Sequence, residues 1–201
     1  MNARPLALPW LACTAALAAL FGALQPYWET NDDVAMAMIV HGYGIAAAPD
    51  PATVFQNVLY GRLVQALPEP FGLQGYGVAT YGLLLLSFAA CCLALQRAGA
   101  PRVPAAVALF AIFAPALVYP QFTLVAGLLG AAGGLILCAP ASRLSIVECA
   151  LGSTLLVVAA LVRLDEVLFL GVIVSPFLLG AARTDRSRRR RLVALACAAL
   201  L

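Results

Sequence analysis

Long apolar stretches separated by short polar segments dominate this chain. A transmembrane helix needs about 20 mostly apolar residues, and six of the stretches approach that length. The pattern predicts an all-α protein, a polytopic transmembrane helix bundle in a single domain covering 1–201. We expect its spans near 6–25, 75–95, 103–119, 122–139, 145–162 and 167–182. A last apolar run, 192–201, has about half the required length, so we expect the chain to be a truncated copy or N-terminal portion of a longer protein.

Composition favours the same class. Hydrophobic residues make up 64% of the chain and charged residues 10%, and the mean hydropathy is +0.98. A soluble domain has about a quarter of its residues charged. The 6 cysteines all fall in apolar stretches without a CxxC pair. We therefore expect them to be small buried side chains, with neither a disulfide framework nor a zinc site.

The distribution of arginines predicts the orientation, because the chain contains no lysine. With the N-terminus inside, each inner segment is basic, whereas the loop 26–74 is acidic apart from Arg62. This agrees with the positive-inside rule and makes the loop 26–74 extracytoplasmic. The basic run 183–191 is then a topology signal near anionic lipid, and no nucleic-acid partner is indicated. The first apolar segment exceeds a signal-peptide core in length, so we interpret it as a retained helix. The inner arginines are Arg4, Arg97, Arg102, Arg143, Arg183, Arg186 and Arg188 to Arg191.

The acidic loop has its own organisation, with two short surface helices expected. Thr30 or Asn31 can cap the first helix, and Gly42-Tyr43-Gly44 ends it. After the rigid turn Pro49-Asp50-Pro51 we expect a second, amphipathic helix that lies along the membrane surface. Its apolar side would carry Phe55, Val58, Leu59, Leu63, Ala66 and Leu67, and its polar side mainly Gln56, Asn57, Tyr60 and Gln65.

Two adjacent acids, Asp32 and Asp33, begin the first surface helix. Carboxylates at a membrane surface are suited to acid–base chemistry or to metal binding. They also have a structural explanation, because the helix dipole favours negative charge in a first turn by about 0.3–1 kcal/mol. Neighbouring helical residues point about 100° apart. One acid would therefore act while the other orients it or caps the helix.

Three motifs in this loop carry a resemblance to a known family. They are Trp28-Glu29-Thr30-Asn31-Asp32-Asp33, the turn Pro49-Asp50-Pro51, and Phe55-x-Asn57-x-Leu59-x-Gly61-x-Leu63. In this order they resemble the first outer loop of bacterial membrane glycosyltransferases of the GT-C superfamily. The resemblance covers the loop, and extends to the remaining spans only by topology.

The resemblance implies a multi-pass enzyme of the bacterial inner (cytoplasmic) membrane. It would transfer a sugar from a polyprenyl-phosphate donor to an unknown acceptor on the extracytoplasmic face. Asp32 or Asp33 would be the catalytic base or, as in some members, a metal ligand. Hard carboxylate oxygens suit Mg²⁺ or Mn²⁺. Asn57, within the third motif, is a candidate substrate-binding residue.

A second polar cluster, Arg163, Asp165 and Glu166, falls between the last two predicted spans, on the same outer face. Ionisable residues next to membrane spans are candidates for function. Arg163 is a candidate for binding the carrier phosphate, since guanidinium matches phosphate oxygens. The alternative is an Arg163–Glu166 pair at i,i+3. His41 is the only histidine and a candidate substrate-binding residue that would share a face with Asp33; the alternative is an ordinary polar surface residue.

Two other functions remain open. A small-molecule or lipid transporter should show ionisable residues near mid-membrane or broken helices around a central site, but here the acids cluster outside. A non-catalytic membrane protein or remnant is the other alternative, because GT-C enzymes are generally longer. Gly127, Gly130, Gly133 and Gly134 follow a membrane segment, so we expect them to pack helices together rather than bind phosphate.

Overall fold

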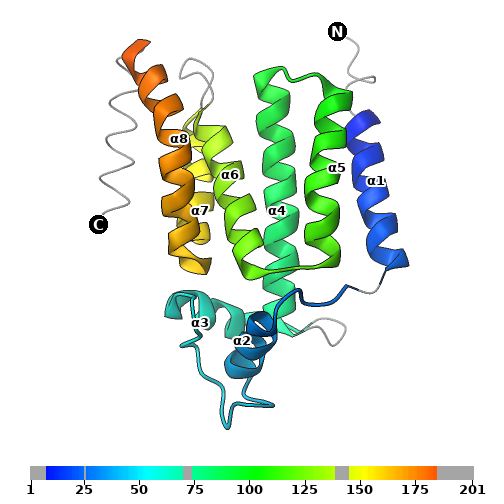
Figure 1. Cartoon of the computed structure of the whole chain (residues 1–201), viewed down its shortest axis with the longest axis vertical. Coiled ribbons are helices and arrows are strands. Elements are labelled where there is room, and N and C mark those ends of the chain that lie inside the picture. The colour runs from blue at the N-terminus through cyan, green and yellow to red at the C-terminus, as the bar shows by residue number, and fades with distance from the viewer. Residues whose placement is uncertain (1–7, 25, 70–73, 139–144, 185–201) are drawn as a thin grey trace.

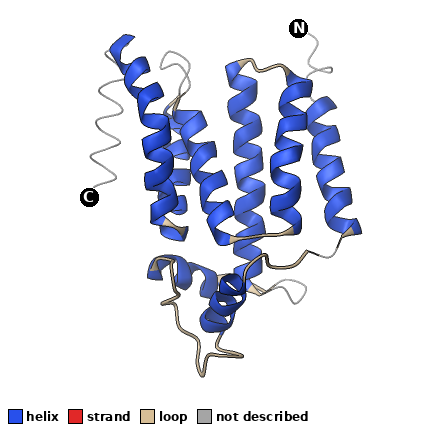
Figure 2. Cartoon of the chain, in the orientation of Figure 1, coloured by secondary structure: helices blue, strands red, loops and turns tan. Residues whose placement is uncertain are grey.

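The computed structural model describes residues 8–24, 26–69, 74–138 and 145–184, with side chains as far as Pro176. Within these ranges the protein has eight helices and no strand, which confirms the all-α prediction (Figure 2). The helices are α1 (Leu8–Ala23), α2 (Asn31–His41), α3 (Val58–Ala66), α4 (Gly75–Ala98), α5 (Arg102–Val118), α6 (Phe122–Leu137), α7 (Ile146–Val162) and α8 (Leu164–Thr184).

The six longer helices stand side by side, and α2 and α3 lie across one end of them (Figure 1). We call the end that meets α2 and α3 the capped end. The α5–α6 and α7–α8 junctions are at the capped end, whereas the α4–α5 junction is at the opposite end. Successive helices therefore run up and down, and segments far apart in sequence meet at the capped end.

The longer helices coincide within a few residues with the predicted apolar stretches, except that the run 192–201 lies outside the described residues. Among the described residues, α4, with 24 residues, is the one helix both long and apolar enough to cross a membrane. The helices α1, α5, α6 and α7 are also apolar, but have only 16 or 17 residues. At 1.5 Å per residue, 16 residues span about 24 Å, whereas the hydrocarbon core of a bilayer is about 30 Å thick.

The centre of the bundle is α6, which packs against α4, α7 and α8, while α1 packs on α5. Two glycines allow α6 and α7 to approach closely. A Cβ atom at Gly133 would lie 2.7 Å from the carbonyl oxygen of Gly152. Gly130 also faces neighbouring side chains, but Cβ atoms at Gly127 or Gly134 would meet nothing within 4 Å. Only two of the four glycines expected to pack helices together therefore do so.

Gly133→Ala is expected to destabilise the protein by about 1–3 kcal/mol, because α6 and α7 must move apart to admit the methyl group. Gly134→Ala is the matched control, since its methyl group enters open space and alanine favours a helix over glycine. Thermal unfolding of the detergent-solubilised protein measures the difference. Equal melting temperatures for the two variants would show that the α6–α7 contact is not as close as described.

At the end opposite the capped end, an ion pair joins α4 to α7. The Arg97 Nη1 atom lies 2.9 Å from Glu148 Oε1. Glu148 also forms a capping box with Ser145 at the start of α7. The acid therefore stabilises a helix start, a backbone role that needs no substrate.

At the capped end, α2 ends as predicted. Gly42 is in the left-handed region at φ 72°, and its N–H donates to the Met38 carbonyl. The predicted start of the second surface helix was wrong. It begins at Val58, where the Asn57 side chain accepts a hydrogen bond from the Leu59 N–H. Phe55 lies before the helix and has a φ of 69°. The polar cap, which apolar periodicity does not detect, decides the first residue.

The orientation of α3 follows from its contacts. Tyr60, Gly61 and Val64 are buried, and the Gln65 side chain donates to the Val40 carbonyl of α2. A Cβ atom at Gly61 would collide with the Pro51 carbonyl oxygen, so only glycine fits there. The apolar side chains of Leu59 and Leu63 are exposed. The side of α3 that carries Tyr60, predicted to be polar, is therefore the buried one.

Candidate functional site

The two adjacent acids have opposite environments. The Asp33 side chain is 0% exposed and accepts three hydrogen bonds. Thr30 Oγ1 donates to Oδ2 at 2.8 Å, and Tyr76 Oη and the Phe122 backbone N–H donate to Oδ1 at 2.9 and 3.1 Å. Asp32 is exposed. Of the two, Asp32 is therefore the carboxylate that a substrate reaches without rearrangement.

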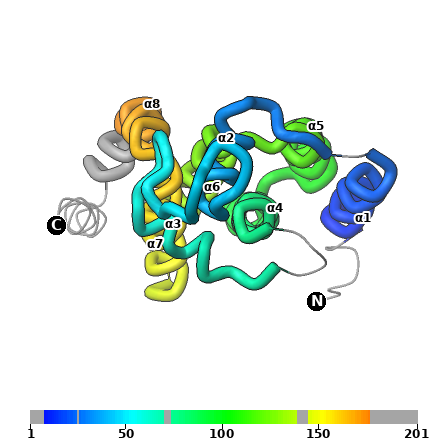
Figure 3. Tube along the Cα trace, turned by 90° about the horizontal axis from the view of Figure 1, so that it is seen from below, coloured from blue at the N-terminus to red at the C-terminus, as the bar shows by residue number. Residues whose placement is uncertain are grey.

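Asp33 fixes the start of α2 to two helices of the bundle, α4 through Tyr76 and α6 through Phe122. The network continues outward, because Gln56 Nε2 donates to Tyr76 Oη at 3.2 Å and Thr53 Oγ1 donates to Gln56 Oε1 at 3.2 Å. Figure 3 shows α2 from below, beside the end of α4 and in front of α6. The network therefore fixes the start of α2, which carries Asp32, relative to the bundle.

Burial raises the pKa of the Asp33 carboxyl above its usual value, and the charge of Asp32 raises it further. The three hydrogen bonds act in the opposite direction, because they stabilise the charged form. Burial has the larger effect, as expected for a carboxylate taken out of water.

Arg163 is at the same end of the bundle, at the C-terminus of α7. Its Nε donates to both carboxylate oxygens of Asp165 at 3.0 Å, and its Nη1 donates to Thr123 Oγ1 at 2.6 Å. The alternative Arg163–Glu166 pair at i,i+3 is also present, with Nε and Oε1 4.0 Å apart. The shorter contacts to Asp165 and to Thr123 of α6 add to it in orienting the arginine.

Two aromatic rings lie beside the Arg163 guanidinium. The Arg163 guanidinium carbon lies 5.1 Å from the centroid of the Phe122 ring and 5.6 Å from that of Phe55. The two rings are nearly parallel, with centroids 6.0 Å apart. Phe122 therefore connects both clusters, because its N–H binds Asp33 and its ring contacts Arg163.

The structure places His41 and Asn57 in supporting positions. The His41 Nε2 atom accepts a hydrogen bond from the Tyr76 N–H at 3.1 Å, and its Nδ1 atom lies 3.6 Å from Glu69 Oε1. A neutral ring accepting at Nε2 carries its proton on Nδ1. Asn57 is exposed, but its side chain caps α3. Both residues therefore already have structural roles at the capped end.

The donor set around the acid pair does not fit a dedicated metal site. Within the described ranges, no three side chains of His, Cys, Asp or Glu gather in a way that could hold a metal ion. Three hydrogen bonds already occupy lone pairs of Asp33, out of about four on a carboxylate. We therefore assign no step to Mg²⁺ or Mn²⁺.

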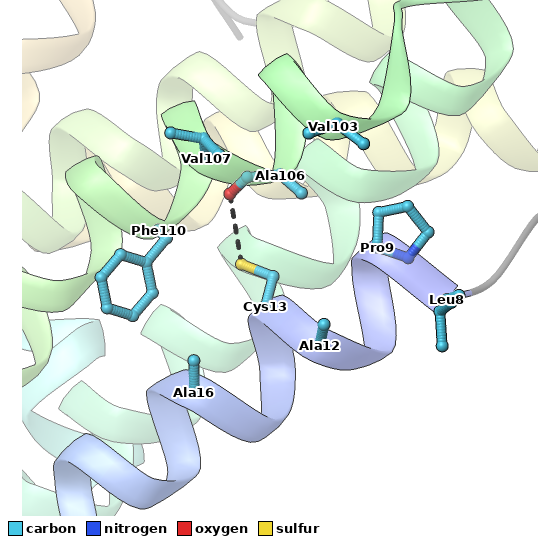
Figure 4. Close-up of a pocket in the computed structure, with 9 residues that line it drawn as sticks. All are labelled: Leu8, Pro9, Ala12, Cys13, Ala16, Val103, Ala106, Val107 and Phe110. Atoms are coloured by element: carbon cyan, nitrogen blue, oxygen red, sulfur yellow. Dashed lines mark hydrogen bonds between the residues drawn. The ribbon is translucent and has the colours of Figure 1, made fainter.

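A groove between α1 and α5 is apolar. It is lined by Leu8, Pro9, Ala12, Cys13, Ala16, Val103, Ala106, Val107 and Phe110 (Figure 4). Its one polar contact is the Cys13 thiol, which donates to the Ala106 carbonyl at 3.4 Å. This groove offers a ligand no charged group. The acid pair and Arg163, in contrast, lie at the capped end.

Comparison with protein-family models, curated proteins and solved structures finds no match for the chain. The site must therefore be interpreted from its own geometry. Sequence reasoning missed Tyr76 and Phe122, which position the acid and the arginine. No sequence signal marks Phe122, because its bond to Asp33 uses the backbone.

Proposed function

We propose that the chain is a multi-pass membrane protein that transfers a sugar from a polyprenyl-phosphate donor on the extracytoplasmic face, as a GT-C-like glycosyltransferase. The observation that carries the proposal is Phe122, which joins an acid pair to an arginine at one end of an apolar bundle. This transfer requires a base and a group that binds phosphate, and the acid pair and the arginine can supply them.

The exposed apolar surface of the bundle supports the membrane part of the proposal. Large hydrophobic side chains on three helices are exposed, and large apolar patches on soluble monomers are uncommon. A bilayer would cover them. They include Leu8, Leu11 and Phe21 on α1, Val103, Val107 and Ile112 on α5, and Leu168, Phe169, Val172 and Ile173 on α8.

In the proposed reaction, the Asp32 carboxylate accepts the proton of the acceptor hydroxyl. The hydroxyl oxygen attacks the anomeric carbon of the sugar, and the bond from that carbon to the phosphate oxygen breaks. Polyprenyl phosphate leaves with the bonding electrons, and the Arg163 guanidinium offsets its negative charge. Asp33 touches no reacting atom and positions Asp32.

A transfer assay tests this function directly. The chain, reconstituted in vesicles with a radiolabelled polyprenyl-phosphate sugar and a panel of hydroxyl acceptors, is expected to release polyprenyl phosphate and label an acceptor. Thin-layer chromatography measures both products, with vesicles lacking the protein as the control. Absence of either product with every donor and acceptor would count against a transferase.

The membrane orientation has a separate test. Asp50→Cys, in a background without the native cysteines, is expected to react with an impermeant maleimide added outside intact cells. Ala98→Cys, at the opposite end of α4, is the matched control and should react only after permeabilisation. Both residues are exposed in the structure. The reverse pattern would invert the orientation, and labelling of both positions from outside would exclude a membrane span between them.

A further inference from the structure

We propose that Phe55 is the platform on which the sugar ring of the ligand stacks, with Asp165 and Arg163 binding its polar groups. This inference rests on the proposed function and deepens it by naming a sugar-binding residue. It is carried by the conformation, support and exposure of one aromatic side chain.

The backbone of Phe55 is strained. Its φ of 69° is in the left-handed region, which bulky residues with a Cβ atom rarely adopt. Such conformations persist only where surrounding contacts impose them, and they concentrate at functional sites. Here the next two residues impose it. The Gln56 side chain is bonded to Tyr76 and Thr53, and the Asn57 N–H donates to the Leu161 carbonyl at 2.9 Å.

The ring of Phe55 packs against a buried ring and is still largely exposed. It lies nearly parallel to the Phe122 ring, with an interplanar angle of 12° and centroids 6.0 Å apart. The Arg163 guanidinium carbon lies 5.6 Å from its centroid, and Phe55 remains 58% exposed. An exposed aromatic ring that is held by a second ring and an arginine is a flat binding surface with little conformational entropy to lose.

The groups beside this ring match a sugar phosphate. The electron-rich face of an aromatic ring attracts the C–H bonds on the apolar face of a pyranose. The Asp165 carboxylate is exposed and can accept hydrogen bonds from sugar hydroxyls. The Arg163 side chain is 24% exposed, and its guanidinium carries five N–H donors, of which two are used by Asp165 and Thr123. The rest can meet a phosphate.

The neighbouring exposed apolar residues define the alternative, an interfacial anchor in which Phe55 only contacts lipid. Val54, Leu59 and Leu63 are also exposed. An anchor does not require the ring to lie parallel to a second ring beside an arginine. Leu59→Ala is therefore the matched control, since it removes exposed apolar surface without touching the platform.

Two measurements test the platform. In the first, detergent-solubilised protein binds a short-chain polyprenyl-phosphate sugar or the sugar-free polyprenyl phosphate, measured by calorimetry. Phe55→Leu is expected to weaken binding of the sugar-bearing lipid about tenfold and to leave the sugar-free lipid unchanged. Phe55→Trp and Leu59→Ala are expected to bind both lipids like the wild type.

In the second measurement, Phe55→Trp provides a fluorescent probe for methyl glycosides, which lack the lipid and the phosphate. Titration with methyl glucoside, galactoside or mannoside is expected to change the fluorescence of Trp at position 55. The acyclic alcohol sorbitol should not. The wild-type protein, whose 2 tryptophans are Trp10 and Trp28, gives the background.

The outcomes separate the two proposals. If lipid-linked sugars do not bind but glycosides change the fluorescence, the platform stands and the glycosyltransferase proposal fails. If the donor binds and Phe55→Leu binds it like the wild type, the platform is overturned and the glycosyltransferase proposal stands. Two results would show that Phe55 is not a sugar platform. In one, the sugar-bearing lipid does not bind and the glycosides do not change the fluorescence. In the other, Phe55→Leu and Leu59→Ala weaken the binding of both lipids equally.

Discussion

Asp33→Ala is expected to be less stable than Asp33→Asn by about 2–4 kcal/mol, the largest stability effect that the structure predicts. Both variants remove the buried charge, so the comparison isolates the hydrogen bonds. Asparagine keeps an oxygen for the Tyr76 hydroxyl and the Phe122 N–H, and its amide can donate to Thr30 after the hydroxyl rotates. Alanine leaves the two donors at Oδ1 unpaired in the protein interior.

The pH dependence of the wild type provides a second check on Asp33. The folded-state pKa of this carboxyl is raised, so the folded protein holds the proton at pH values where the unfolded chain has lost it. Stability from this group is therefore greatest at low pH and falls as the pH rises from the unfolded pKa through the folded one. Asp33→Asn lacks this dependence. Its stability relative to the wild type is therefore expected to increase from pH 4 to pH 7.

Thermal unfolding of the three proteins at both pH values measures these effects. Because the variants differ at one site, the difference between wild type and Asp33→Asn cancels the titration of other groups. Equal melting temperatures for the alanine and asparagine variants would show that the carboxylate does not bind Tyr76 and Phe122. If the stability of the wild type instead increases relative to Asp33→Asn as the pH rises, the pKa of Asp33 is lowered in the folded state and not raised.

Asp32→Asn is expected to lower sugar transfer by at least about a hundredfold, the lower range for loss of a general base. The amide cannot accept the proton of the acceptor hydroxyl, but it has nearly the same size as the carboxylate. Because Asp32 is exposed, the substitution should lower the stability by no more than about 0.3–1 kcal/mol, the size of the helix-dipole interaction. Initial rates of polyprenyl-phosphate release, with protein amounts matched by folded fraction, measure the effect.

Glu29→Gln is the matched control for Asp32, since Glu29 is another exposed acid of the same loop. It should retain wild-type activity. Asp33→Asn is expected to retain activity within about tenfold, because it preserves the geometry that positions Asp32. Full activity of Asp32→Asn would show that Asp32 is not the catalytic base. A larger loss in Asp33→Asn than in Asp32→Asn would exchange the roles of the two acids.

Much of the helical framework follows from local patterns in the sequence. The apolar stretches predicted the longer helices to within a few residues, and Gly42 ends α2 as expected because it adopts a positive φ. The sequence could not reveal which of two adjacent acids is buried. That depends on Tyr76 and Phe122, which lie 43 and 89 residues from Asp33.

The surface helices show a different limit of sequence patterns. Apolar periodicity grouped Phe55 with Leu59 and Leu63, and all three are indeed exposed. The period could not reveal that the chain turns at Phe55, because a hydrogen-bonding cap at Asn57 decides where α3 begins. Nor could it show that Phe55 reaches Arg163, 108 positions away, because only the fold brings the two together.

Phe122 also makes the acid pair and Arg163 respond together. Its peptide nitrogen binds Asp33 and its ring contacts the guanidinium, so one residue at the start of α6 touches both clusters. A displacement of the start of α6 would therefore disturb the acid and the arginine at the same time, whereas a change confined to one cluster has a direct route to the other.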